Sequence, residues 1–216
     1  MGGSVAVVDP DEQIAARGED GRRRCRWALG TPDYLAYHDE EWGRPVTGED
    51  ELFERLSLEA FQSGLSWLTI LRKRGNFRRA FAGFSIECIA AFGPADFDRL
   101  MNDAGIVRNR LKVEAVMANA HAAAEMHARG ELLSELFWSH RPRGRQRAPR
   151  TWGDVPATTP ESEALAKELK RRGFRFVGPT TVYASMQACG VVNDHAAGCW
   201  VRPEVERERR QSLEQT

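Results

Sequence analysis

Apolar residues recur at helical spacing over most of the chain. In segment 52–71, leucine and phenylalanine return at steps of three, four and five residues, which predicts one long helix. A second apolar series begins at Ile106 and passes into alanine-rich sequence up to about Ala128. Further helices are predicted over 161–172 and 182–189. No stretch alternates with period two for long enough to predict a strand, so the pattern indicates an all-α protein.

The two ends of the chain lack this pattern. Residues 1–22 are polar, contain glycine and show no periodicity, and we expect a disordered N-terminal extension there. Residues 204–216 alternate charge with few apolar positions, which predicts a frayed, charged C-terminal tail. Residues 23–203 then form a single domain, which is long enough to bury a sizeable core.

Composition narrows the class of protein. Hydrophobic residues make up 42% of the 216 positions, and no apolar run reaches the roughly 18 residues that a membrane span needs. The first residues lack the charged and apolar regions of a secretory signal, so we expect a cytoplasmic protein with no membrane partner. The formal net charge is zero, but arginine is concentrated in 141–150, a loop by its Pro and Gly content. That loop could contact phosphate or could merely aid solubility.

Four cysteines in a cytosolic chain favour metal binding or plain burial over disulfides. His195 and Cys199 are four residues apart, which on a helix would place both side chains within reach of one ion. Together with Cys25 and His38 they form a set of two cysteines and two histidines, typical of a closed, structural zinc site. Such an ion would connect the N-terminal segment to a C-terminal helix. The alternative is a buried cysteine beside a surface histidine.

The helices predicted around 161–189 are joined by a turn that two glycines bracket. Backbone N–H groups exposed at such a turn, together with the dipole of the following helix, bind phosphate without reading the base. The pattern resembles a helix-hairpin-helix DNA-binding motif, although Thr180 stands where a second closely spaced glycine is common. An ordinary helical corner is the alternative. The candidate DNA-binding residues are Gly173, Arg175, Gly178, Thr180 and Thr181, and either threonine could cap the second helix.

A carboxylate and a group of aromatic residues suggest a base-binding pocket. Glu59 interrupts an apolar stretch of the first long helix, which also carries Trp67. Aromatic rings can stack on an extruded purine while a carboxylate accepts from its exocyclic amine, and a cationic methylated base gains from both. Core packing is the alternative for these rings. The aromatic residues upstream are Trp27, Tyr34, Tyr37 and Trp42.

Several longer stretches occur together in one order. They are RCRW at 24–27, YLAYHDEEWG at 34–43, LEAFQSGLSW at 58–67, AGIVRNR at 104–110, FRFVG at 174–178 and MQACGVVNDH at 186–195. Over roughly residues 23–203 these stretches resemble the 3-methyladenine DNA glycosylase I family. The resemblance implies an all-helical, helix-hairpin-helix glycosylase fold, with the hairpin at about 161–189.

The resemblance also implies an activity and a site. It implies hydrolysis of the N-glycosidic bond of 3-methyladenine in double-stranded, alkylated DNA, after the nucleotide has flipped into the aromatic pocket. Glu59 would contact the methylated base, Trp67 would stack on it, Tyr34 and Tyr37 would line the pocket, and Trp27 is a weaker member. One structural zinc ion is implied at Cys25, His38, His195 and Cys199.

The remaining expectations concern mechanism and assembly. No lysine suggests a Schiff-base nucleophile, so we expect a monofunctional glycosylase. Asp194 is not assigned a catalytic role, because the family lacks the catalytic aspartate of its superfamily. One duplex contact suffices, so we expect a monomer. Two other readings stay open: a non-catalytic, zinc-stabilised DNA-binding module, and a glycosylase for a different lesion.

Overall fold

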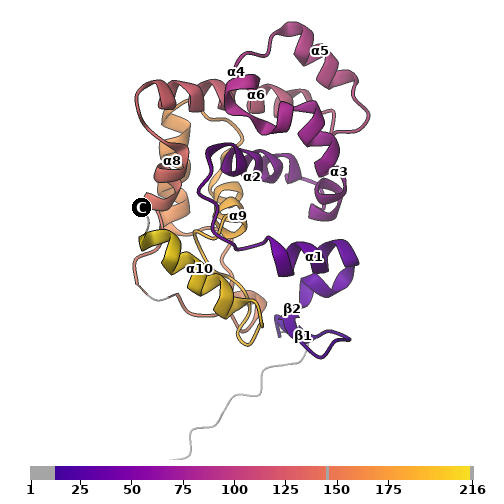
Figure 1. The fold of residues 1–216 in the computed structure, drawn as a ribbon, viewed down its shortest axis with the longest axis vertical. Coiled ribbons are helices and arrows are strands. Elements are labelled where there is room, and N and C mark those ends of the chain that lie inside the picture. Colours follow the sequence, from indigo (N-terminus) through magenta and orange to yellow (C-terminus); the bar gives the residue numbers. More distant parts are fainter. Residues whose placement is uncertain (1–12, 145, 215–216) are drawn as a thin grey trace, which may run out of the picture.

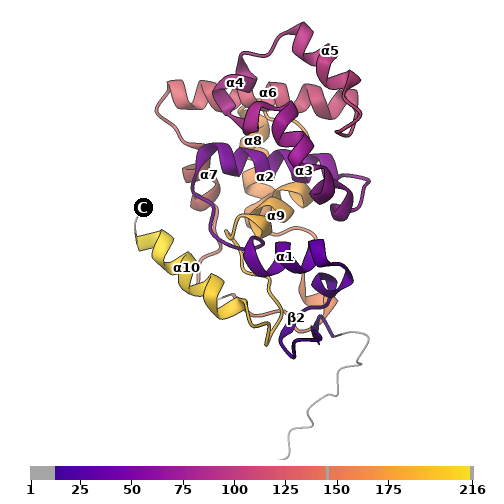
Figure 2. The same ribbon diagram turned by 45° about the vertical axis from the view of Figure 1, so that its right-hand side comes forward.

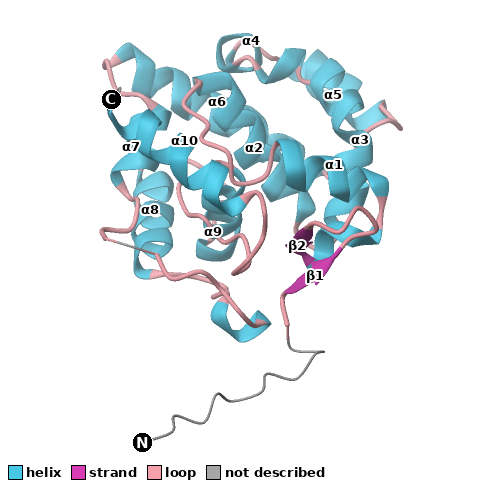
Figure 3. Cartoon of the chain, turned by 60° about the horizontal axis from the view of Figure 1, so that its bottom comes forward, coloured by secondary structure: helices cyan, strands magenta, loops and turns pink. Residues whose placement is uncertain are grey.

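The structure is a computed structural model that describes residues 13–144 and 146–214, and helices dominate it (Figures 1 and 3). The elements are β1 (Ala15–Arg17), β2 (Arg23–Cys25), the 3₁₀ helix η1 (Arg26–Gly30), α1 (Pro32–Glu40), α2 (Glu49–Gln62), α3 (Trp67–Ala80), η2 (Ala82–Phe84), α4 (Ile86–Ala90), α5 (Pro94–Asn102), α6 (Arg110–Ala128), α7 (Leu133–Ser139), η3 (Trp152–Asp154), α8 (Pro160–Arg171), α9 (Pro179–Ala188) and α10 (Arg202–Glu214). The predicted all-α class is confirmed. No helix in the described ranges is long and apolar enough to cross a membrane.

Helix α2 lies at the centre of the core (Figure 2). Ten consecutive residues of α2, from Leu52 to Phe61, are buried, because α3, α6, α7 and α9 pack around it. Its C-terminal end is closed by Lys112 of α6, whose Nζ donates to the carbonyls of Phe61 at 2.8 Å and Ser63 at 2.6 Å. These bonds satisfy carbonyl groups that a helix end would otherwise leave unpaired, so the position of α2 is well defined.

The long helix predicted over 52–71 is wrong, because the chain turns at residues 63–66. Gly64 adopts a φ of +78°, and the side chain of Ser66 accepts a hydrogen bond from the Thr69 N–H to cap α3. The apolar spacing continues across the turn because both helices face the same core. As a consequence, Glu59 and Trp67 come from two different helices.

The helices and the turn predicted around 161–189 are present as α8 and α9. Thr159 caps α8 by accepting a hydrogen bond from the Ser162 N–H, and Pro160 takes the first helical position. The cap of α9 is Gly178, with Pro179 in the first helical position, so neither Thr180 nor Thr181 caps it. Both threonines instead lie inside the first turn of the helix.

Both chain ends are more ordered than the sequence predicts. The disorder expected over 1–22 is wrong for residues 13–22, because β1 pairs with β2 in an antiparallel ribbon, while residues 1–12 lie outside the described residues. The frayed tail expected over 204–216 is a helix up to Glu214, since Val205 and Arg209 of α10 pack against the body. A small second core joins the two ends and includes Ile14, Ala15, Cys25, Ala196, Cys199, Val201 and Val205.

Candidate functional site

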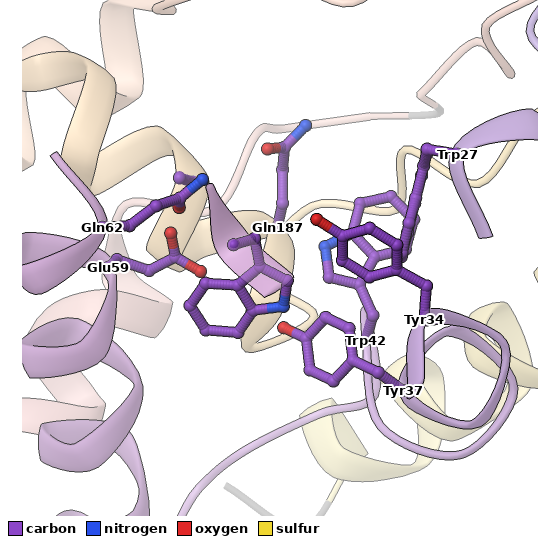
Figure 4. A pocket seen from close by; sticks show the side chains of 9 residues that line it. Trp27, Tyr34, Tyr37, Trp42, Glu59, Gln62 and Gln187 are labelled. Atoms are coloured by element: carbon purple, nitrogen blue, oxygen red, sulfur yellow. The ribbon is translucent and has the colours of Figure 1, made fainter. Parts of the chain in front are cut away.

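A pocket of about 290 Å³ opens between α1, α2, α3 and α9 (Figure 4). It is lined by Trp27, Tyr34, Tyr37, Trp42, Glu59, Gln62, Trp67, Ala184 and Gln187. The five residues predicted for it from the sequence therefore come together in one place. Sequence reasoning noted Trp42 among the rings and Gln62 on the helix of Glu59 without assigning either a role, and it missed Gln187. Gln187 could have been suspected from the sequence, because it is a polar residue within a largely apolar helix.

The aromatic residues hold one another in place around this pocket. The ring of Trp27 meets the rings of Tyr34 and Trp42 edge-on, with centroids 5.6 and 5.2 Å apart. On the other side, Tyr37 and Trp67 lie 5.3 Å apart at a tilt of 44°. The Tyr34 hydroxyl accepts a hydrogen bond of 3.0 Å from the backbone N–H of Leu68, which ties α1 to the start of α3. The rings thus form a preformed wall.

Glu59 reaches the pocket from the opposite side, beside Gln62 (Figure 4). Glu59 is 7% exposed, and its carboxyl group forms no hydrogen bond with any described residue. Burial raises the pKa of Glu59 to about 8, and the positive charge of Arg55, one turn earlier, opposes that rise. Arg55 is itself held by Glu41, 3.0 Å away. An acid without partners among aromatic rings suits a ligand that brings positive charge or hydrogen-bond donors.

A second cluster lies behind the pocket wall. The ligand atoms of Cys25, His38 and Cys199 all lie within 4.8 Å of one another, and all three residues are buried. His195 is close to them, with its ring centroid 5.0 Å from that of His38, and its Nε2 atom is buried without a hydrogen-bond partner. Three of the four predicted ligands therefore form one potential metal-binding group, and the orphaned nitrogen belongs to the fourth.

Outer contacts orient both imidazole rings. The Nδ1 atom of His38 lies 2.8 Å from Asp39, which Arg24 holds in turn, and the Nδ1 atom of His195 lies 3.1 Å from Asn193 Oδ1. In each ring, Nδ1 therefore contacts a neighbouring polar side chain, and Nε2 is left available to the cluster. This arrangement is usual for metal-ligating histidines. Burial lowers the pKa of His195 and favours the neutral ring, the form that binds metals.

The helix expected to carry His195 and Cys199 is wrong. Both residues lie in the irregular segment between α9 and α10, and the backbone turn, rather than helical spacing, brings them to Cys25. The segment also touches the pocket wall, since the His195 ring lies 4.6 Å from that of Trp42. A side chain at Gly43 would come within 2.7 Å of the His195 ring, so this close approach requires glycine.

The turn between α8 and α9 is held by α6. Asn119, which is buried, accepts a bond of 2.7 Å from the Arg175 N–H and donates one of 3.1 Å to the Arg175 carbonyl. Gly173 adopts a φ of +95°, which favours glycine there. Sequence reasoning missed Asn119, because nothing in the local pattern of α6 distinguishes it. The turn is thereby fixed, with Gly178 at the start of α9.

Comparison with known proteins agrees with this geometry. The model of the methyladenine glycosylase family matches residues 27–202. The chain is 46% identical to DNA-3-methyladenine glycosylase 1 of Escherichia coli K12 over 183 residues, which is 83% of this chain and 97% of that protein. A crystal structure of 3-methyladenine DNA glycosylase I, also 46% identical, superposes with a TM-score of 0.80 over 83% of this chain and all of that one.

A further solved structure is informative about ligands. It is a tyrosine-to-phenylalanine variant of 3-methyladenine DNA glycosylase I in complex with 3-methyladenine, and it is 35% identical to this chain. It superposes with a TM-score of 0.76 over 83% of this chain and 97% of the other. The helical fold and the pocket are thus those of a DNA glycosylase, an enzyme that removes a damaged base from DNA. The chain belongs to the methyladenine glycosylase family.

Proposed function

We propose that the protein hydrolyses the N-glycosidic bond of 3-methyladenine in alkylated, double-stranded DNA and releases the free base. The names of its relatives support this activity. The observation that carries it is the Glu59 carboxyl group, buried without a hydrogen bond opposite a wall of aromatic rings. A module that only holds phosphates has no use for such a carboxylate, so this pocket argues against the non-catalytic alternative.

The chemistry follows from the charge of the damaged base. 3-Methyladenine in DNA is cationic, so its glycosidic bond can break without protonation of the leaving base. We propose that the nucleotide flips into the pocket, that Trp67 stacks on the base, and that Glu59 meets its donors and its charge. Tyr34, Tyr37 and Trp27 complete the wall. Water then attacks the sugar carbon, the bonding electrons leave with the base, which departs neutral, and the attacking water loses one proton to solvent as the sugar hydroxyl forms.

We further propose that the enzyme is monofunctional. No lysine lines the pocket in the described residues. Lys112 approaches α2 from outside the pocket, and its ammonium group donates to two backbone carbonyls. A Schiff-base nucleophile therefore has no candidate, and water is the nucleophile.

Release of free base from alkylated DNA tests this function directly. Purified protein is incubated with methylated duplex DNA, and the released bases are separated and identified. We expect 3-methyladenine to be released and the sugar backbone to remain uncut. Binding without release would favour the DNA-binding module, and release of a different base would favour the alternative lesion.

The charge state of Glu59 gives a prediction about pH. Because its pKa is raised to about 8, the free protein holds Glu59 mostly protonated at neutral pH, and a cationic base requires the carboxylate. We expect kcat/KM to rise by up to tenfold per pH unit, about 1.4 kcal/mol each, until a bend near pH 8. Single-turnover rates between pH 5.5 and 9.5, with the enzyme well below saturation, measure this. A flat profile, or one that falls toward pH 8, contradicts the role of the carboxylate.

We propose that the cluster behind the pocket holds one structural zinc ion through Cys25, His38, His195 and Cys199. Two thiols, two Nε2 atoms and outward-bonded Nδ1 atoms fit a tetrahedral zinc set. With four protein ligands no position remains for a reacting water, so the ion would stabilise the fold. The residues themselves would link the β2 segment to the chain before α10.

We propose that the turn between α8 and α9 binds the phosphate backbone of the substrate. The candidate contacts are Gly173, Arg175, Gly178, Thr180 and Thr181. The start of α9 offers backbone N–H groups and a favourable dipole, and Asn119 holds the turn in shape. We also propose a cytoplasmic monomer whose catalytic domain spans about 23–203.

Removal of the Asn119 side chain tests the turn. Asn119→Ala leaves the Arg175 N–H and carbonyl without their partner, so we expect a loss of about 1–3 kcal/mol of stability and weaker binding of undamaged duplex. Binding of free 3-methyladenine should not change, because the pocket is elsewhere. Asn102→Ala, which removes an exposed amide from α5, is the control. Equal DNA affinity for both variants would contradict the role of the turn.

A further inference from the structure

The arginine-rich loop found in the sequence does not lie against the pocket or the α8–α9 turn. Segments 139–144 and 146–148 face α10 and enclose a groove, which consists of two adjoining cavities of about 650 and 430 Å³. Figure 1 shows α10 at the end of the molecule that also holds α1 and the two strands. We call this feature the basic groove, and its cationic residues are Arg141, Arg143, Arg147, Arg202, Arg209 and Arg210.

The walls of the basic groove are fastened to the protein body. Gln146 accepts a hydrogen bond of 3.0 Å from the Asn193 N–H, and Arg141 donates one of 3.0 Å to the Trp138 carbonyl. On the helix side, Arg202 donates to the Asn193 carbonyl at 2.6 Å and Arg209 to the Val191 carbonyl at 2.7 Å. Both walls are therefore held in shape without a ligand.

Positive charge in the basic groove is largely uncompensated. Its lining contains a single acidic residue, Glu206, which pairs with Arg209 at 3.2 Å. The Nε atom of Arg209, a residue that is 8% exposed, is buried without a hydrogen-bond partner. Four arginines that line the groove are exposed and form no ion pair with any described residue. They are Arg141, Arg143, Arg147 and Arg210.

The other basic clusters of the sequence behave differently. On α3, Arg72 pairs with Asp33 at 2.9 Å, and Arg74 and Arg78 are likewise paired with glutamates. At the end of α8, Arg171 pairs with Glu168 at 2.6 Å and Arg172 with Glu131. Arg79, Lys170 and Arg175 of these clusters form no ion pair with a described residue, but the basic groove gathers four such arginines in one concave place of a chain whose formal net charge is zero. Their mutual repulsion is relieved when an anion binds there.

We propose that the basic groove binds phosphate groups of the DNA backbone, at a place separate from the pocket and from the α8–α9 turn. Guanidinium groups match phosphate oxygens through paired hydrogen bonds, and two adjoining cavities offer room for more than one phosphate. The inference rests on the proposed function in that DNA is the polyanion the protein meets. The loop wall of the basic groove lies within the match to the family model, which ends at residue 202, whereas most of α10, with Arg209 and Arg210, lies beyond it.

The salt dependence of DNA binding tests the proposal. The groove variant carries Arg143→Gln, Arg147→Gln and Arg210→Gln, and the control variant carries Arg72→Gln, Arg110→Gln and Arg129→Gln. The control removes the same charge from exposed arginines that are already ion-paired. The dissociation constant of an undamaged duplex of about 30 base pairs is measured across salt concentrations, where each phosphate contact contributes about 0.9 to the logarithmic slope.

We expect the slope of the groove variant to fall by roughly 2 to 3, and that of the control by less than 1. An equal fall in both variants, or none in the groove variant, overturns the proposal. Titration with inorganic phosphate separates the sources of the anion. If phosphate binds the wild type and not the groove variant while the DNA slope stays unchanged, the groove is a small-anion site and DNA binding there is excluded.

A measurement on the wild-type protein avoids any effect of substitution on folding. Arginine residues are modified with a dicarbonyl reagent and located by mass spectrometry, with and without the undamaged duplex. We expect DNA to protect Arg143, Arg147 and Arg210 and to leave Arg72 reactive; equal reactivity of all four overturns the proposal. Neither measurement needs base release, so a protein that binds DNA here and releases no 3-methyladenine would contradict the proposed function alone.

Discussion

Replacement of Glu59 by glutamine is expected to reduce the rate of 3-methyladenine release by about 10²–10³-fold, the range typical for loss of one preorganised electrostatic contact. Glutamine keeps the size of the side chain and removes the negative charge that a cationic base meets in the pocket. Single-turnover release from methylated duplex measures the rate. Full activity of the variant would show that the carboxylate takes no part in the reaction.

The same substitution is expected to raise stability. Because burial raises the pKa of Glu59 above its ordinary value of 4.5, the folded state favours the protonated acid. Stability is therefore lost as pH rises from about 4.5 to 8, by about 1.4 kcal/mol per pH unit, and glutamine removes that loss. Thermal unfolding at pH 8.5 should show a higher Tm for the variant. Glu51→Gln, on the exposed side of α2, is the control and should change neither activity nor Tm by much.

Loss of the proposed zinc site is expected to cause a large loss of stability. Cys199→Ser removes a buried thiol of the proposed zinc site, which would join the segment before α10 to β2, and structural zinc sites contribute several kcal/mol to folding. A loss of about 4 kcal/mol would lower Tm by about 8–16 °C in a chain of this size. Wild-type protein treated with a strong chelator should show a similar fall.

Cys88→Ser is the matched control, since Cys88 is exposed and lies outside the cluster. Metal content is measured on the same samples, and we expect about one zinc per wild-type chain and per control chain. Wild-type protein that is folded, free of metal and as stable as the loaded form would contradict the structural role. Protein that stays folded after metal loss should keep base release, because the pocket carries the chemistry.

The sequence predicted the helical class because apolar spacing reports which face of an element is buried. It could not locate the break at residues 63–66, since α2 and α3 face the same core and the apolar series continues through the turn. A glycine with positive φ and a serine cap mark the break, and both occur in the printed motif. The ends were mispredicted for a related reason, because the start of β1 is held by a backbone hydrogen bond from Ile14 to Arg150 and α10 by a side-chain hydrogen bond from Arg209 to the Val191 carbonyl, contacts that the local pattern does not show.

The candidate pocket was predicted well because most of its lining comes from one stretch, from Trp27 to Trp67. The contribution of α9 was missed, since Gln187 reaches the pocket only through the packing of α9 on α2. The sequence also could not show which basic residues form ion pairs with acidic ones. Whether an arginine such as Arg72 is paired depends on an acid 39 positions away, whereas Arg143 forms no ion pair with any residue that the structure describes.

The connection between Cys199 and His38 has a consequence for the order of events during synthesis. The two residues lie 161 positions apart, so His38 leaves the ribosome about 8–30 s before Cys199 at ordinary elongation rates. Throughout that interval Cys25, His38 and the aromatic wall beside them lack the segment that closes the small second core. Closure of this core is thus the last step in making the domain, and a nascent chain that ends before Cys199 remains open there.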